Sequence, residues 1–258
     1  MRTGAITGYI DVAQLTLYAF FIFFAGLVLY LRREDKREGY PLASDRSGQV
    51  TVQGFPPTPP AKQFLMPHGE GLRRSNPGER RPIAVLPTAP WPGAPMQPTG
   101  NPMQDGVGSA SYAMRADEPD LAYDDGLPKI VPLRVAPDFF LATEDPDPRG
   151  MTVIGADRHA AGVVKDAWVD RSETVIRYVE VELDRSLGGG AVLLPMNFMQ
   201  MDPKRRRIGV QSILANQFAG VPRLQNPDQV TLREEDKIMA YYGGGKLYAK
   251  ASRLEPLL

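Results

Sequence analysis

The most constraining feature of this sequence is an uncharged run of 20 residues, VAQLTLYAFFIFFAGLVLYL, at positions 12–31. At about 1.5 Å of rise per residue, a helix of this length spans roughly 30 Å, the hydrocarbon thickness of a bilayer. Twelve of its residues are Leu, Ile, Phe or Val, and the polar Gln14 and Thr16 lie near one end. The run therefore predicts a single transmembrane helix that anchors the rest of the chain.

The charges that flank this run predict its orientation. Arg2 and Asp11 precede it, whereas RREDKRE follows directly at 32–38. Because positive residues accumulate on the cytoplasmic side, we expect the amino terminus outside and the bulk of the chain in the cytoplasm. A cleaved signal peptide is the alternative, but the run is long and no small-residue cleavage site precedes the charged cluster.

Composition narrows the chemistry that the chain can perform. Lys and Arg together equal Asp and Glu, 30 each, so nothing indicates a nucleic-acid partner. The absence of cysteine excludes disulfides and thiolate ligands, and the two histidines, His68 and His159, are far apart. No phosphate loop, nucleophile elbow or metal-ligand spacing occurs. We therefore expect a chain that is not an enzyme and binds no cofactor or metal by itself.

Between positions 41 and 150 the chain is rich in proline, with 20 of the 25 prolines of the sequence. Proline removes a backbone donor, so regular elements should be few and short. Composition alone permits a disordered linker, but apolar residues such as Phe55 and Trp91 are interleaved throughout. We expect an extended segment that orders against a surface, with short strands at 50–53, 64–66 and 83–86.

After Gly150 the pattern becomes that of a compact β-rich module, a small barrel or sandwich. Val179, Val181 and Leu183 alternate with Glu180 and Glu182, so the apolar residues should share one face and the glutamates the other. The strand-like runs are separated by turns and lie at 151–155, 162–170, 175–183, 191–196 and 207–211.

Two helices should follow the strands. Ser212 can cap a short helix that runs through Phe218. Thr231 and Glu234 have the spacing of a capping box, and that helix should end near Tyr242, at the glycines 243–245.

Three charged clusters have both a structural and a functional interpretation. The acids of REEDK (233–237) most simply form a solvated helix face, and PKRRR (203–207) a hairpin tip that could alternatively touch anionic lipid. Arg177 shares the predicted face of Val179 and should lie near buried surface, with Glu173 or Asp170 as its partner. The pair is either a structural ion pair or part of a carboxylate network that passes protons.

Eight blocks of sequence point to a family. They occur in the order YLRREDKREGYPL (30–42), FLMPHG (64–69), PTGNPMQDGVGSASYA (98–113), KIVPLRVA (129–136), DPDPRGMTV (145–153), WVDRSE…RYVEVEL (168–183), SILANQFAGVPRL (212–224) and LREEDKIMAYYGGGKLYA (232–249). Together with the membrane span they closely resemble the H subunit of the purple-bacterial photosynthetic reaction centre.

This resemblance implies a single transmembrane helix and a mainly-β cytoplasmic PRC-barrel domain with a C-terminal helix. The implied divisions are a periplasmic amino terminus (1–11), the span (12–31), an extended surface segment (32–104) and the barrel domain (105–258). The chain would reside in the bacterial inner, intracytoplasmic photosynthetic membrane.

The resemblance also implies partners and a role. H subunits cap the cytoplasmic face of the L and M subunits, support assembly and help to deliver protons to the secondary quinone. L and M carry bacteriochlorophyll, bacteriopheophytin, quinones and non-haem iron, whereas a carotenoid, a cytochrome subunit and a light-harvesting antenna are left open. Membrane lipid is a further expected partner.

The resemblance places two residues beside the proton route of the secondary quinone. They are the acid of WVDxxE and the arginine four residues later, here Glu173 and Arg177. Some members carry surface histidines before KIVP that bind inhibitory metals, whereas this chain has LAYDDGLPKIVP with Asp124 and Asp125. Proton uptake through these acids is expected to persist, and metal binding is in doubt.

Two other classes of function compete with this one. A membrane-tethered PRC-barrel adaptor for an unrelated partner would not need the long apolar-studded segment that matches the H subunit block by block. A tethered enzyme would need a nucleophile–base or metal constellation, which the sequence lacks.

Overall fold

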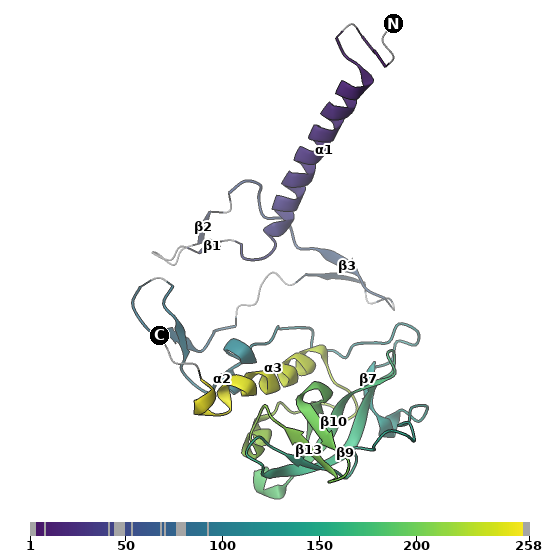
Figure 1. Cartoon of the computed structure of the whole chain (residues 1–258), viewed down its shortest axis with the longest axis vertical. Coiled ribbons are helices and arrows are strands. Elements are labelled where there is room, and N and C mark those ends of the chain that lie inside the picture. The colour runs from purple at the N-terminus through teal and green to yellow at the C-terminus, as the bar shows by residue number, and fades with distance from the viewer. Residues whose placement is uncertain are drawn as a thin grey trace. The chain divides into compact units, whose positions relative to one another are not determined.

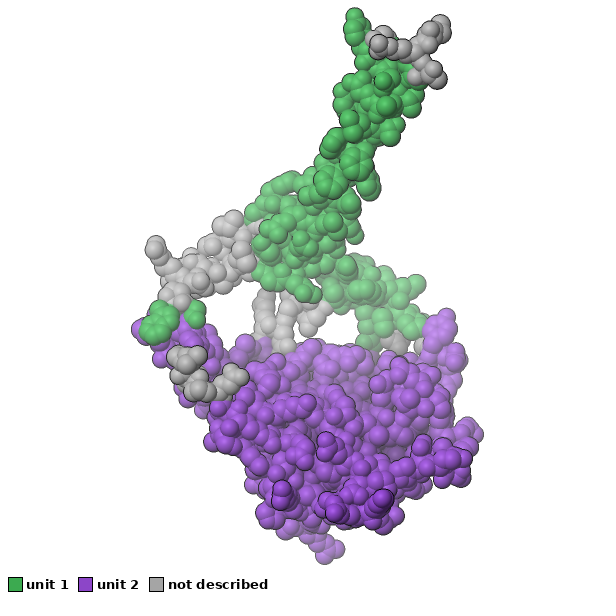
Figure 2. Space-filling model, in the orientation of Figure 1, with its two compact units in different colours: residues 1–78, 91–93 green, residues 79–90, 94–258 purple. Residues whose placement is uncertain are grey.

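The computed structural model describes residues 4–7, 9–40, 42–43, 50–52, 54–67, 69, 71–75, 81–91 and 93–254. His68 lies outside these residues. The chain divides into two compact units, shown in green and purple in Figure 2. The first comprises residues 1–78 and 91–93, and the second comprises 79–90 and 94–258.

The first unit begins with α1 (Val12–Asp35), whose length and hydropathy suit a membrane span. Asp11 caps the helix by accepting a hydrogen bond from the Gln14 amide at 2.8 Å. The two polar side chains of the span are satisfied within the helix, because Thr16 donates to the Val12 carbonyl and Gln14 donates to Tyr18, each at 2.8 Å. The helix continues four residues beyond the predicted span, and none of its residues is buried.

Short antiparallel hairpins follow the helix. They pair β1 (Leu42–Ala43) with β2 (Val50–Val52), β3 (Gln63–Leu65) with β4 (Leu72–Arg74), and, in the second unit, β5 (Val85–Pro87) with β6 (Met96–Pro98). The three predicted short strands are thus confirmed to within two residues at their starts. Large apolar side chains stay exposed here, including Phe55 at 79% and Leu65 at 81%, as expected of a segment that packs on a partner.

A seven-stranded sheet forms the centre of the second unit. Its order is β11-β10-β9-β8-β13-β12, and β7 pairs with β9. The strands are β7 (Ile130–Pro132), β8 (Thr152–Ile154), β9 (Ala160–Asp170), β10 (Val175–Leu183), β11 (Ala191–Pro195), β12 (Met199–Asp202) and β13 (Arg207–Val210). The five predicted strands are confirmed, whereas β7 and β12 were not predicted. PKRRR forms the β12–β13 hairpin tip, as expected.

The core of this unit lies between the sheet and the long helix α3 (Leu232–Tyr248), shown in yellow in Figure 1. Trp168, Ile238 and Tyr242 are fully buried within it. The short helix α2 (Pro102–Asp105) packs against α3. Single 3₁₀ turns occur at Gly108–Ala110, Leu133–Val135, Arg185–Leu187, Met196–Phe198 and Ala251–Arg253.

Both helix predictions near the carboxyl terminus need correction. The predicted capping box of Thr231 and Glu234 is confirmed, but α3 does not end at the glycines and runs through them to Tyr248. A Cβ at Gly244 would lie 2.4 Å from the Ala110 Cβ, and one at Gly245 would lie 2.7 Å from the Ser212 carbonyl oxygen. Glycine is therefore needed for close packing here, which outweighs its poor helix propensity.

The predicted helix capped by Ser212 is instead a 3₁₀ helix at Ala215–Gly220 with Leu214 at its N-cap. Gln217 supplies the capping interaction, since its side-chain oxygen accepts a hydrogen bond from the Leu214 amide at 2.8 Å. The Ser212 side chain is buried and its hydroxyl makes no hydrogen bond among the described residues.

Candidate functional site

The turn between β9 and β10 brings together three of the predicted site residues. Asp170 ends β9 and is only 1% exposed. Its Oδ1 accepts hydrogen bonds from the amides of Ser172 at 3.0 Å and Glu173 at 3.1 Å, which shapes the turn. Arg177 reaches back across the turn, with Nη2 2.6 Å from Glu173 Oε2 and 3.3 Å from Asp170 Oδ2. Both predicted partners of Arg177 are therefore paired with it.

The position of Arg177 differs from the predicted one. Its side chain is 43% exposed rather than buried, and Glu180, which was predicted on the face opposite Val179, is only 4% exposed. The pairing of β9 and β10 shifts register between Ile176 and Tyr178, and again between Glu180 and Val181. The first shift leaves Arg177 as an extra residue on β10 and breaks the alternation between Arg177 and Val179. The predicted apolar face holds beyond it, because Val179, Val181 and Leu183 are all buried.

A second acid, Glu235 on α3, lies close to this turn. Its Oε2 accepts a hydrogen bond from the Tyr178 hydroxyl at 2.9 Å. Burial raises the pKa of Glu235 above its usual value, although the Tyr178 hydrogen bond opposes the rise. Burial, together with the neighbouring Glu235 charge, also raises the pKa of Tyr178.

Glu235 and the turn line one cavity of about 470 Å³. Asp170, Arg177, Tyr178 and Glu235 all contribute to its walls, together with Arg115, Asp120 and Lys129. The solvated face predicted for REEDK is wrong for two of its acids, because Glu234 is buried in the capping box and Glu235 is partly buried in this cavity. The capping box was recognisable in the sequence, but the Tyr178–Glu235 pairing joins positions 57 residues apart.

Asp124 and Asp125 are placed differently from one another. Asp125 pairs with Arg171, the residue after Asp170, and accepts a hydrogen bond from the Leu127 amide at 2.9 Å. The Arg171 hydrogen bond, supported by the Leu127 amide, holds the pKa of Asp125 below its usual range. Asp124 is exposed and makes no hydrogen bond or ion pair among the described residues. The structure thus brings Asp125 to the base of the turn and leaves Asp124 in solvent.

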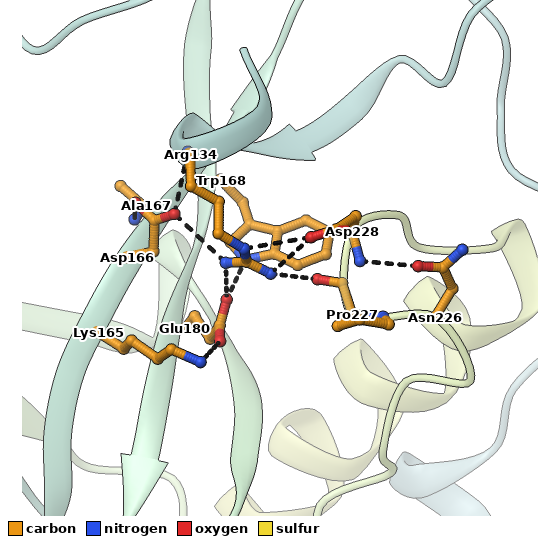
Figure 3. A network of polar contacts seen from close by, with 9 residues as sticks. All are labelled: Arg134, Lys165, Asp166, Ala167, Trp168, Glu180, Asn226, Pro227 and Asp228. Carbon is orange, nitrogen blue, oxygen red and sulfur yellow. Dashed lines mark hydrogen bonds and ion pairs between the residues drawn. The ribbon is translucent and has the colours of Figure 1, made fainter. Parts of the chain in front are cut away.

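A separate polar network lies further along β9 and β10, centred on Arg134 (Figure 3). Arg134 Nη1 lies 2.5 Å from Glu180 Oε2 and 3.3 Å from Asp166 Oδ2, and Nη2 lies 3.0 Å from Asp228 Oδ1. Glu180 also accepts hydrogen bonds from Lys165 and the Trp168 indole. Although burial opposes it, these donors hold the pKa of Glu180 below its ordinary value. The network joins four segments of the second unit and is a structural clamp.

The described residues contain no group of three or more His, Asp or Glu side chains that could hold a metal ion. The acid cluster at the β9–β10 turn is paired with arginine, which suits a carboxylate network rather than a cation site.

Fold and site together define a protein with one apolar helix suited to a membrane and a separate mainly-β domain carrying paired acids at one turn. A family model of the PRC-barrel domain matches residues 143–217. A second family model, the photosynthetic reaction centre H-chain N-terminal region, matches residues 4–135, about half of the chain. The chain therefore belongs to the H-chain family and is a subunit of the photosynthetic reaction centre. Membership of this family implies association with the L and M subunits.

Proposed function

We propose that this chain caps the cytoplasmic face of the L and M subunits, supports their assembly and delivers protons to the secondary quinone. The observation that carries the proton role is that Asp170, Arg177 and Glu235 line one cavity, and that Glu173 is joined to them through its ion pair with Arg177. Reduction of a quinone to a quinol takes up two protons, and a site beneath a protein cap needs carriers to supply them.

The pKa directions favour some carriers over others. A relay must both gain and release a proton, so it works best when its pKa lies near the operating pH. Burial moves Glu235 toward that range, whereas pairing with Arg171 moves Asp125 away from it. In this proposal Glu173 passes protons toward the quinone and Glu235 is the second carrier, while Asp124 offers an exposed point of uptake.

The capping role has separate support. The exposed apolar side chains of residues 54–99 need a covering surface, and L and M would provide it. We retain 32–104 as the extended segment and 105–258 as the barrel domain. The pigments, quinones and non-haem iron belong to L and M in this proposal, and this chain binds none of them itself.

The proposed orientation follows from the ends of α1. Arg32 and Arg33 lie in its last turn, followed by Lys36 and Arg37, whereas only Arg2 and Asp11 precede it. The amino terminus would therefore lie in the periplasm and the PRC-barrel domain in the cytoplasm.

The proton role is tested by Glu173→Gln in purified complexes. Gln keeps the shape and hydrogen-bonding capacity but does not titrate. We expect the first electron transfer to the secondary quinone to be unchanged, and the second, proton-coupled transfer to slow by about tenfold or more. Flash-induced absorbance and proton uptake measured across pH report the two steps separately.

Glu182→Gln is the matched control, because Glu182 is an exposed glutamate at the other end of β10 and, unlike Glu173, does not pair with a residue that lines the cavity. It should leave both transfers unchanged. If Glu173→Gln leaves the second transfer and proton uptake unchanged at every pH, then Glu173 is structural and the relay runs elsewhere, through Asp124, Asp125 or Asp170.

A further inference from the structure

A second hollow of the PRC-barrel domain carries an excess of positive charge. It is a groove of about 860 Å³ between the β8–β9 turn and the β12–β13 hairpin. Arg158, Lys204 and Arg207 line it, and Asp202 is the only acidic residue among the described residues that do so. Because the whole chain has equal numbers of acidic and basic residues, this concentration of charge is local.

The charges of the groove are only partly neutralised. Asp202 is shared by two arginines, with Oδ2 3.6 Å from Arg207 Nε and 3.5 Å from Arg205 Nη1. Arg158 and Lys204 are exposed and have no ion-pair partner among the described residues. Arg158 also occupies the left-handed region with φ +67°, where glycine or asparagine is the usual choice. Because the side chains of Arg158 and Lys204 are exposed and not paired with an acid among the described residues, both can bind a ligand.

The floor of the groove is open enough for a ligand to reach the strands. Gly209 on β13 pairs with Gln200 on β12, and a Cβ at Gly209 would have no heavy atom closer than 3.8 Å. The missing side chain leaves a hollow between Arg207 and Gln211, residues that lie roughly 13 Å apart at 3.3 Å per strand residue. Amide side chains of Gln200 and Gln211 flank it.

We infer that this groove binds a soluble anion that carries phosphate groups. Arginine and lysine with flanking amides supply the donors that phosphate oxygens accept, and the volume lies within the range of small-molecule sites. A lipid headgroup carries the same phosphate chemistry, but the position of the groove disfavours a membrane lipid as the ligand. Arg207 in the groove is level with Val163 of β9 through Thr152, so even the nearer end of the groove lies roughly 23 Å along β9 from Asp170 at the β9–β10 turn.

This choice of a soluble ligand rests on the proposed function. If the β9–β10 turn faces the quinone, the groove lies further along β9, at a distance from the membrane surface. A membrane surface potential decays within a Debye length, about 8 to 10 Å at physiological salt. The groove is then beyond the reach of the bilayer but open to solutes of the cytoplasm.

The test is equilibrium dialysis of radiolabelled pyrophosphate against purified reaction centre complexes at low ionic strength. Lys204→Ala and Arg158→Asn should each weaken binding by about fivefold, since exposed charged contacts contribute modestly. Asn tolerates the left-handed backbone at position 158. Asp202→Asn keeps the acceptor for the Arg205 amide at 3.1 Å but removes the charge, so binding should tighten by about threefold.

The tightening is the decisive result, because a damaged fold would not produce it. Arg185→Ala removes an exposed arginine outside the groove and should change nothing. Equal binding by all these variants, or none by the wild type, would refute the site. Pyrophosphate binding that Glu173→Gln leaves intact supports the site whatever happens to proton transfer. Binding to vesicles of anionic phospholipid that depends on Lys204 and is not displaced by pyrophosphate would assign the groove to lipid and overturn the proposal.

Discussion

The three consecutive glycines of α3 provide a test of how tightly the helix packs. A Cβ at Gly243 would have only the Ser109 carbonyl oxygen nearby, at 3.5 Å, which is an ordinary contact. Alanine is favoured over glycine in a helix by about 1 kcal/mol, so Gly243→Ala should stabilise the domain by about 0.5 to 1 kcal/mol.

Gly244→Ala should have the opposite effect. Its Cβ would lie 2.4 Å from the Cβ and 3.0 Å from the Cα of Ala110, and the backbone of a short 3₁₀ helix cannot yield as a flexible side chain can. Overpacking of this kind costs about 1 to 3 kcal/mol, and the contact with the backbone places it at the upper end. After subtraction of the helix propensity gain, we expect a net loss of about 2 kcal/mol.

Thermal unfolding of the full chain in detergent distinguishes the two variants. The sequence has two tryptophans, and the buried Trp168 reports unfolding of the barrel by its fluorescence, whereas Trp91 is 62% exposed. For a domain of this size, Tm changes by about 2 to 4 °C for each kcal/mol of change in the free energy of unfolding. Gly243→Ala should therefore raise Tm by about 1 to 4 °C, and Gly244→Ala should lower it by about 4 to 8 °C.

A second substitution tests whether contact with residue 110 causes the loss of stability in Gly244→Ala. Ala110→Gly removes the nearest atom, and in the Gly244→Ala background it should restore part of the lost stability, since the Cα of residue 110 remains at 3.0 Å. If Gly244→Ala melts at or above the temperature of Gly243→Ala, α3 does not pack against residue 110 closely enough to exclude a Cβ at position 244.

Two further predictions concern the clamp and the orientation. Arg134→Ala leaves the buried Glu180 and Asp166 without their main cation, and it should destabilise the full chain by about 2 to 3 kcal/mol. This is below the usual range for breaking a buried ion pair, because the Arg134 side chain is a third exposed. An unchanged Tm would show that Lys165 alone is sufficient to stabilise the Glu180 carboxylate. In sealed inside-out vesicles, added protease should digest the bulk of the chain, and protection there with cleavage only from the periplasmic side would reverse the proposed orientation.

The elements that the sequence predicted well are those set by local pattern. The apolar run determines α1, the Thr231–Glu234 spacing determines the start of α3, and alternation with turn residues between runs determines five strands. β12 (MQMD) escaped prediction because it has no β-branched residue and only four positions. The end of α3 was missed because glycine signals either a helix stop or a close approach, and only the neighbouring residue 110 decides between them.

The acid cluster shows where local pattern fails at a site. Asp170, Glu173 and Arg177 lie within eight positions, so their pairing could be predicted from the turn between two strands. The contacts of Glu235 and Arg134 could not be predicted, because their partners lie tens of residues away in the sequence and no periodic pattern indicates such contacts. The register shift beside Arg177 was equally invisible, and it changes which side of β10 faces the core.

The contacts of the turn also separate its two acids into different roles. A carboxylate offers about four acceptor sites, and Asp170 uses all of them, with two amide donors on Oδ1 and the Arg177 Nε and Nη2 on Oδ2. It is buried and holds the turn in place. Glu173 has Arg177 as its single side-chain partner among the described residues and is 54% exposed, so it has room to turn and free sites to accept a proton. Within the proposed relay, Asp170 is therefore the anchor and Glu173 the carrier.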